Sequence, residues 1–274
     1  MKISNKDFEF VTEFAMHNAA IVLEPGKEYL VESRLSPLAK ENGCETLEEY
    51  VAKLRVEASM SVMHRAAIDA LTTNETLFFR DFKPFEMLRK EIIPELIENR
   101  RKLRRLNIWS AASSTGQEPY SLAMLLREHF PELNDWHVTI VGTDISQSAL
   151  EKAKAGIFNQ FEVNRGLPAP MLFKYFDSAD GKWIIKKEVR DTVDFKPLNL
   201  IQSWPIFPPL DLVLIRNVLI YFDVETKTSI LNKIGACVQP NGRLLLGSSE
   251  STVGMDTGWK PLDYEDSTAY ELAS

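Results

Sequence analysis

Apolar residues in the first part of the chain recur at the three- and four-residue spacing of amphipathic helices. Ser4 is a predicted N-cap for the first helix, and Thr46 with Glu49 forms a capping box for a later one. A helix between them carries Pro37, which predicts a kink. We therefore predict a small all-helical domain over residues 1–72.

From residue 106 the pattern changes to short apolar runs without charge. Residues 106–112 predict a strand buried on both faces, and the small residues 113–116 predict a tight turn. Pro119 then marks the first turn of a helix whose apolar residues, at helical spacing, predict a half-buried face. Strand, turn and helix in this order are typical of the opening unit of a doubly wound α/β sheet.

More strands follow, interrupted by one long insertion. Buried strands are predicted over residues 137–144, 211–217 and 242–247, and two short terminal strands over residues 259–272. The insertion covers about residues 156–199, and its aromatic runs on either side of a DSADG turn predict a β-hairpin. We expect an antiparallel subdomain inserted into an α/β domain that spans residues 106–274.

A linker and one helix join the two domains over residues 73–105. Its start, TTNETLFFRD from Thr72, mixes polar side chains with two phenylalanines, which is typical of a loop held against the protein. Helical spacing resumes after it and ends in the basic run 100–105. We interpret that run as a solvated helix end, where cations face the negative end of the helix dipole.

Composition narrows the function. The chain has 274 residues and a formal net charge of -7, which disfavours a nucleic-acid-coating protein. Cys44 and Cys237 lie far apart and match no metal-ligand spacing, which indicates reduced thiols in a cytoplasmic protein. The polar N-terminus is unlike a signal peptide, and no apolar run approaches the roughly 18 residues of a membrane span. Any contact with a membrane is therefore expected through a partner.

Polar side chains stand where the predicted strands end. Glu118 lies in the turn after the first strand, Asp144 ends the second, and Arg216 with Asn217 ends the third. Ligands of open α/β sheets bind at this edge. Each position also has a structural interpretation: an ordinary buried turn, a helix-capping aspartate, and an arginine paired with a carboxylate.

Several familiar chemistries are excluded by missing motifs. The four histidines share no metal-binding spacing with cysteines or acids, so no metal site is predicted. No phosphate-binding GxxxxGK[ST] loop and no GxSxG elbow occur, which argues against NTPases and serine hydrolases.

Six segments together resemble one family. They are TTNETLFFRD from Thr72, AASSTGQEPYSLAM from Ala111, GTDIS from Gly142, PLNL from Pro197, IRNVLIYFD from Ile215 and LGSSES from Leu246. In this order they resemble the CheR family of chemotaxis receptor glutamate methyltransferases. The resemblance implies a helical N-terminal domain, a linker, and a class I S-adenosylmethionine-dependent methyltransferase domain, which is Rossmann-like and carries an inserted antiparallel β-subdomain.

The resemblance also implies a cofactor site for S-adenosylmethionine, with S-adenosylhomocysteine as the product. It places Asn74, Thr76 and Arg80 at the cofactor, with the arginine suited to the methionyl carboxylate. The other implied roles are Glu118 near the methionyl ammonium, Asp144 at the ribose, Asn199 and Leu200 beside adenine, and Arg216, Asn217 and Tyr221 beside the transferred methyl group. Arg80, Arg216 and Tyr221 are the expected catalytic residues.

The implied acceptor is a glutamate on the cytoplasmic helical bundle of methyl-accepting chemoreceptors. A carboxylate is already ionised at neutral pH and needs no general base, which agrees with the lack of a catalytic histidine motif. The second helix carries few arginines for docking, and the short 177–182 turn predicts independence from a receptor C-terminal pentapeptide. We expect a monomeric cytoplasmic enzyme; the alternatives are methylation of another protein and an inactive cofactor-binding adaptor.

Overall fold

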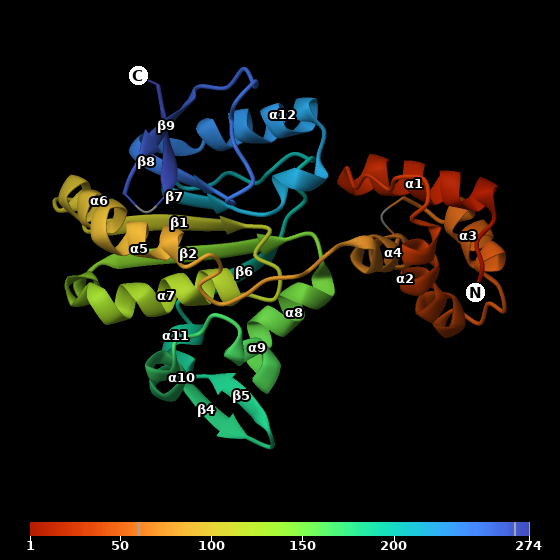
Figure 1. Ribbon diagram of the computed structural model, residues 1–274, viewed down its shortest axis with the longest axis horizontal. Coiled ribbons are helices and arrows are strands. Elements are labelled where there is room, and N and C mark those ends of the chain that lie inside the picture. Colours follow the sequence, from red (N-terminus) through yellow and green to blue (C-terminus); the bar gives the residue numbers. More distant parts are fainter. Residues whose placement is uncertain (60, 266, 274) are drawn as a thin grey trace.

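The structure, a computed structural model, describes residues 1–59, 61–265 and 267–273. A small helical domain stands at one side of a larger α/β domain, and an extended linker crosses from one to the other (Figure 1). A third unit, which carries the strands β4 and β5, projects from the α/β domain on the side of helix α7 (Figure 1). None of the helices in the described ranges combines the length and apolar character needed to cross a membrane.

The helical domain packs four helices around its own core. They are α1 (Asn5–Ala19), α2 (Glu28–Glu41), α3 (Leu47–Val56) and α4 (Val62–Leu71). Ser4 caps α1 as predicted, because its side chain accepts from the Asp7 N–H. The expected box at α3 is only half formed: Thr46 accepts from the Glu49 N–H, but the Glu49 carboxylate accepts from Glu45 N instead of Thr46 N.

The α/β domain is built on a seven-stranded sheet. Its strands are β1 (Arg105–Ala111), β2 (His137–Asp144), β6 (Val193–Pro197), β7 (Leu210–Ile215), β8 (Val238–Leu246), β9 (Trp259–Asp263) and β10 (Thr268–Leu272). They lie in the order β6-β2-β1-β7-β8-β10-β9. The first five are parallel, and β10 and β9 close the edge as an antiparallel pair. From β1 the chain builds outward on one side through β2 to β6, and it then returns to place β7 on the other side of β1. The strand order therefore reverses at β1, and ligand binding is favoured beyond its carboxyl end.

Alternate residues of the central strands enter two different cores. Leu106 and Ile108 of β1 belong to one hydrophobic cluster, while Trp109 and Ala111 belong to another. Residues of the linker helices and of α7 and α8 share the first cluster, and residues of α12 share the second. The helices of this domain outside the insertion are α5 (Lys83–Met87), the π-helical η1 (Leu88–Ile92), α6 (Ile93–Arg100), α7 (Gln117–His129), the 3₁₀ turn η2 (Pro131–Asp135), α8 (Gln147–Ala155), the 3₁₀ turn η3 (Leu219–Tyr221) and α12 (Val224–Gly235).

The insertion forms a separate three-stranded antiparallel sheet, as the resemblance implies. Its elements are β3 (Ile157–Asn159), α9 (Gln160–Asn164), α10 (Ala169–Tyr175), β4 (Phe176–Ala179), β5 (Lys182–Ile185) and α11 (Lys187–Arg190), with strand order β3-β5-β4. The β4–β5 hairpin turns at Asp180 and Gly181, both with positive φ, which suits an Asp-Gly hairpin turn.

Three expectations from sequence need correction. The segment 193–197 was expected inside the insertion, but it forms β6 and pairs with β2 in the large sheet. Helix α7 was expected to be half-buried, but every residue from Gln117 to Leu126 is buried, because the insertion and the linker pack on its outer face. Arg100 was expected in a solvated run, but it is buried and pairs with Asp211, while the other five residues of the run are exposed.

Candidate functional site

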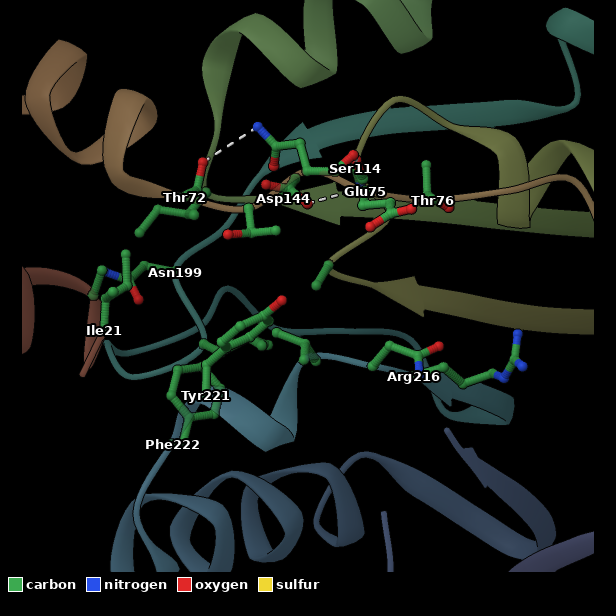
Figure 2. A pocket seen from close by; sticks show the side chains of 18 of the residues that line it. Ile21, Thr72, Glu75, Thr76, Ser114, Asp144, Asn199, Arg216, Tyr221 and Phe222 are labelled. Atoms are coloured by element: carbon green, nitrogen blue, oxygen red, sulfur yellow. Dashed lines mark hydrogen bonds between the residues drawn. The ribbon is translucent and has the colours of Figure 1, made fainter. Parts of the chain in front are cut away.

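A cavity opens beyond the carboxyl ends of the parallel strands. Segments that follow β1, β2, β6 and β7 line it from the α/β domain, and the linker and the helical domain close it from above. Figure 2 shows its length: Ile21 and Asn199 lie toward one end, and Thr76 and Arg216 toward the other. Asp144 and Ser114 lie between these ends, on the wall opposite Tyr221 and Phe222 (Figure 2). The cavity is therefore elongated, with different chemistry at each end.

The turn from β1 into α7 forms the floor of the cavity. Ser114 has φ 49° and Gly116 has φ 93°, so the chain turns sharply before the helix begins. A side chain at Gly116 would meet Ala153, Phe195 and Tyr120 at 3.0 to 3.1 Å, in addition to the strain of its positive φ. Small residues in this turn bring the start of α7, with its outward N–H groups, close to the cavity.

A buried ion-pair cluster occupies the end near Arg216. The Glu118 carboxylate accepts from Ser110 Oγ at 2.8 Å and from Arg216 Nη1 at 3.1 Å. Arg216 Nη2 donates to Asp81 Oδ2 at 2.8 Å and to the Arg80 carbonyl at 3.0 Å. With its side chain only 1% exposed, Arg216 binds the protein's own groups and does not project into the solvent. It joins strand, helix and linker at this end of the cavity.

Asp144 lies midway along the cavity and is only 6% exposed. Its oxygens accept from the backbone N–H groups of Ser114 and Ser146, each at 2.8 Å. It therefore supports the start of α8, as the structural interpretation expects, and also lines the cavity. Burial raises the pKa of the Asp144 carboxyl above its ordinary value, and the two backbone hydrogen bonds oppose that shift.

The linker covers the cavity as an ordered strap. Asn74 Nδ2 donates to Ser146 Oγ at 3.2 Å, and the Asn74 carbonyl accepts from Ser114 Oγ at 2.7 Å. Farther along, the buried Phe79 donates its N–H to Ser121 Oγ at 2.9 Å. The Arg80 side chain lies at the cavity and donates one hydrogen bond, to the Glu75 carbonyl at 3.2 Å. The polar residues of the linker thus both anchor it to the α/β domain and line the cavity.

The helical domain supplies part of the cavity wall, which no sequence pattern predicts. Ala19 and Ile21 at the end of α1, and Leu71 at the end of α4, line the cavity. Asn199 Nδ2 donates to the Asn18 carbonyl at 2.7 Å, which joins the two domains directly beside the cavity. No motif marks Ala19 or Ile21, because small and aliphatic residues look alike in any helical domain.

The segment after β7 forms the wall opposite Asp144. Asn217 adopts φ 58°, a left-handed conformation that reverses the chain directly after the strand. The one-turn η3 helix follows and ends at Tyr221, which is 39% exposed and lines the cavity with Phe222. This segment places the Asn217 amide in the wall of the cavity and the Tyr221 phenol at its open side.

The polar atoms of the cavity fit S-adenosylmethionine. Asn217 Oδ1 and Arg216 Nε are buried without a hydrogen-bond partner, although buried polar atoms are normally paired. Asn217 Oδ1 and the Glu118 carboxylate suit an ammonium group, and the Asp144 carboxylate suits ribose hydroxyls. No group of histidine, cysteine and acidic residues in the described ranges is placed to hold a metal ion.

Every residue expected at the site from sequence lines this cavity. They are Asn74, Thr76, Arg80, Glu118, Asp144, Asn199, Leu200, Arg216, Asn217 and Tyr221. Residues that sequence reasoning missed are Asp81, which pairs with Arg216, Glu250, which binds the backbone of the 217–220 segment, and the wall residues of the helical domain. Asp81 and Glu250 stand within the quoted motifs, but no single-sequence signal separates them from surface acids.

Comparisons with known proteins agree with this geometry. The all-alpha domain of CheR methyltransferases matches residues 6–72, and their SAM-binding domain matches residues 74–266. "Chemotaxis protein methyltransferase 1" of Pseudomonas aeruginosa is 43% identical over 256 residues, which cover 92% of each chain. "Chemotaxis protein methyltransferase" of Vibrio parahaemolyticus is 39% identical over 274 residues, 98% of each chain, and that of Borreliella burgdorferi is 34% identical over 93% of this chain and 91% of its own.

Proposed function

The chain belongs to the CheR methyltransferase family, and we propose that it methylates glutamate side chains on the cytoplasmic helical bundle of chemoreceptors. The matches to this family confirm the resemblance, the fold class and the cofactor that were predicted from sequence. The chain is an S-adenosylmethionine-dependent methyltransferase of chemotaxis. The acceptor group and the roles of individual residues are the proposal.

The types of residue that line the cavity support a carboxylate as the methyl acceptor. Among the described residues that line it there is no histidine, lysine or cysteine. An alcohol or an amine would usually need a general base before it attacks a methyl group. A glutamate, with an ordinary pKa of about 4.3, arrives ionised at neutral pH and needs none. The carboxylates that line the cavity are engaged by the protein: Glu75 pairs with Arg165, Glu118 pairs with Arg216, and Asp144 accepts from two backbone N–H groups. A site whose acids are occupied in this way favours an acceptor that is already ionised.

The two ends of the cavity suit the two ends of the cofactor. We assign adenine to the end with Asn199 and Leu200, and the ribose hydroxyls to Asp144 in the middle (Figure 2). The methionyl ammonium belongs beside Glu118, and the methionyl carboxylate beside Arg80, whose guanidinium keeps most of its donors available. Asn74 and Thr76 close this end from the linker.

The bound cofactor supplies a methyl group on a positively charged sulfonium, which a carboxylate displaces in line. The protein's part is to align the acceptor and to exclude water. Tyr221, at the open side of the cavity, is placed to orient the acceptor carboxylate. Arg216 contacts Glu118 and Asp81, so we assign it to positioning. We assign Arg80 to the cofactor and Tyr221 to the acceptor carboxylate.

Methyl transfer to receptor-bearing membranes tests this function. The protein is incubated with radiolabelled S-adenosylmethionine and membranes, and receptor bands are treated with alkali before volatile methanol is counted. Alkali-labile counts that disappear in Arg80→Ala support a carboxyl methyl ester formed at this site. Alkali-stable counts would mean that the methylated group is not a carboxylate. Alkali-labile counts found only on an unrelated protein would mean that the acceptor is not a receptor glutamate. Cofactor binding without any transfer would indicate an inactive adaptor.

We also propose that docking does not need a receptor C-terminal pentapeptide. The β4–β5 hairpin closes in a two-residue turn and leaves no extended loop to enclose a peptide. The protein should act as a cytoplasmic monomer that meets membranes only through receptors. Titration with the pentapeptide should show no tight binding, and sedimentation should give one 31.2 kDa species. Saturable binding at low micromolar peptide would contradict the docking proposal.

A further inference from the structure

Glu250 binds the backbone of two loops at the edge of the site. It follows β8 and does not line the cavity. Its Oε2 accepts from Asn217 N at 2.8 Å and from Gly247 N at 2.7 Å. Its Oε1 accepts from Ile220 N at 3.2 Å. One carboxylate therefore binds three N–H donors, two in the loop after β7 and one in its own loop after β8, and so joins the two loops.

The segment that Glu250 holds is the one that brings Asn217 and Tyr221 to the cavity. Asn217 is left-handed, with φ 58°, and Ile220 lies inside the single turn of η3. Neither conformation is stable in isolation: a left-handed residue is strained, and one helical turn is a costly nucleus. The surrounding structure must therefore hold this segment, and the Glu250 carboxylate contacts it at both points.

Gly247 is adapted to the same contact. A Cβ at this position would lie 2.7 Å from Glu250 Oε2 and 2.8 Å from the backbone nitrogen of Asn217. The close approach of carboxylate and backbone is therefore possible only at a glycine. Two residues of the LGSSES motif, Gly247 and Glu250, thus serve one contact.

We propose that Glu250 is a positioning residue for methyl transfer, which acts by holding Tyr221 at the open side of the cavity. This inference rests on the proposed function for its kinetic readout. Glutamine cannot replace the carboxylate, because one of its two terminal atoms is an NH₂ group that would face an N–H donor. Aspartate keeps both acceptor oxygens on a shorter side chain and should recover part of the contact.

The kinetic test compares Glu250→Gln with Glu225→Gln, an exposed glutamate four residues after Tyr221 that loses the same charge. We expect kcat for receptor methylation to fall about 10- to 100-fold in Glu250→Gln, and by less than about twofold in the control. Glu250→Asp should recover part of the loss. In a Tyr221→Ala background, Glu250→Gln should lower kcat little further, because the effect of Glu250 on kcat is proposed to pass through Tyr221.

A second readout does not depend on catalysis. The 7 tyrosines are replaced by 3-fluorotyrosine, and the ¹⁹F signal of Tyr221 is assigned by its loss in Tyr221→Ala. Glu250→Gln should shift and broaden that signal, while Glu225→Gln should leave it unchanged. An unchanged signal, or kinetic losses that multiply in the double variant, would overturn the inference. If the native protein forms no receptor ester, the proposed function fails, and the ¹⁹F comparison still decides the role of Glu250.

Discussion

Two buried arginines stand at opposite ends of the same strands and do different work. At the amino ends of β1 and β7, Arg100 Nε donates to Asp211 Oδ1 at 2.6 Å, and its Nη2 donates to the Pro240 carbonyl at 2.7 Å. At the carboxyl ends, Arg216 bridges Glu118 and Asp81 beside the cavity. Both are buried arginine–carboxylate pairs. Asp211 is the second residue of β7, and that strand ends just before Arg216.

The difference lies in which polar atoms remain unpaired. At the amino end, the other oxygen of Asp211 accepts from the Asn107 N–H at 2.7 Å, and Gln239 donates to the first, so the cluster is satisfied within the protein. At the carboxyl end, Arg216 Nε and Asn217 Oδ1 stay buried without partners. A buried polar cluster that is complete stabilises the fold, whereas an incomplete one at a cavity is prepared for a ligand.

Removal of Asp211 should have the largest effect on stability. Asp211→Ala leaves the Arg100 guanidinium charged and buried without its partner, and it also leaves the Asn107 N–H unpaired. Breaking a buried pair in this way costs about 3–5 kcal/mol of unfolding free energy. Urea denaturation followed by circular dichroism measures the loss, and cofactor affinity of the folded fraction should be retained.

The exposed pair of Arg101 and Glu98 provides the control. Its side chains are 71% and 69% exposed, so solvent screens the interaction. Glu98→Ala should change the unfolding free energy by only about 0–1 kcal/mol. A loss in Asp211→Ala no greater than in Glu98→Ala would show that the amino-end cluster does not hold the sheet together.

Glu118→Gln should have a smaller effect on stability and a larger one on the ligand. Arg216 keeps Asp81 and the Arg80 carbonyl, and the glutamine can still accept from one of its former partners. The proposed contact with the methionyl ammonium loses its charge, which costs about 1.5–3 kcal/mol, or roughly a 10- to 150-fold weaker Kd. Calorimetric titration with S-adenosylhomocysteine measures it, with Glu225→Gln as the matched control.

Equal affinities in Glu118→Gln and the native protein would mean that the carboxyl-end cluster is structural, like the one at the amino end. A stability loss as large as that of Asp211→Ala would point the same way. The Arg100 cluster and the Arg216 cluster would then both serve to stabilise the fold, and neither would bind a ligand.

The sequence predicts the site end of the sheet well, for a physical reason. Buried parallel strands are uncharged apolar runs, so the first polar residue after each run marks its carboxyl end. Asp144 and Arg216 were found in this way, and Glu118 was found in the turn that follows the first run. The parallel sheet brings all three to one edge. Their combination in order then identified the family.

The amino end was misjudged because its pairing is long-range. Arg100 and Asp211 are separated by 111 positions, and Arg100 begins a run of cations whose next four members are exposed. Nothing local distinguishes it from them. The strand β6 was missed for a similar reason: an edge strand alternates buried and exposed residues like a hairpin strand, and only its partner β2 places it in the large sheet. Local pattern does not reveal the partner.

The smallest effect that we predict concerns the pH dependence of cofactor binding at Asp144. Burial raises the pKa of this carboxyl above its ordinary 3.8 in the free protein, so the folded chain binds that proton more tightly than the unfolded chain. Stability of the free protein should therefore fall as the pH rises from 3.8 through the raised pKa. Ribose hydroxyls donate more strongly to the ionised carboxylate than to the neutral acid, so affinity for S-adenosylhomocysteine should rise over the same interval.

Asp144→Asn should lower that affinity by about 0.5–1.5 kcal/mol at neutral pH, since one acceptor is lost and the remaining bond is between neutral groups. It should also flatten the rise of affinity with pH, and any dependence that remains belongs to other groups, such as Glu118 or the ligand. Titration calorimetry at several pH values between 4 and 7 measures both effects. A pH profile that Asp144→Asn leaves unchanged would limit Asp144 to holding the backbone of Ser114 and Ser146, and the carboxyl end of β2 would then be structural as well.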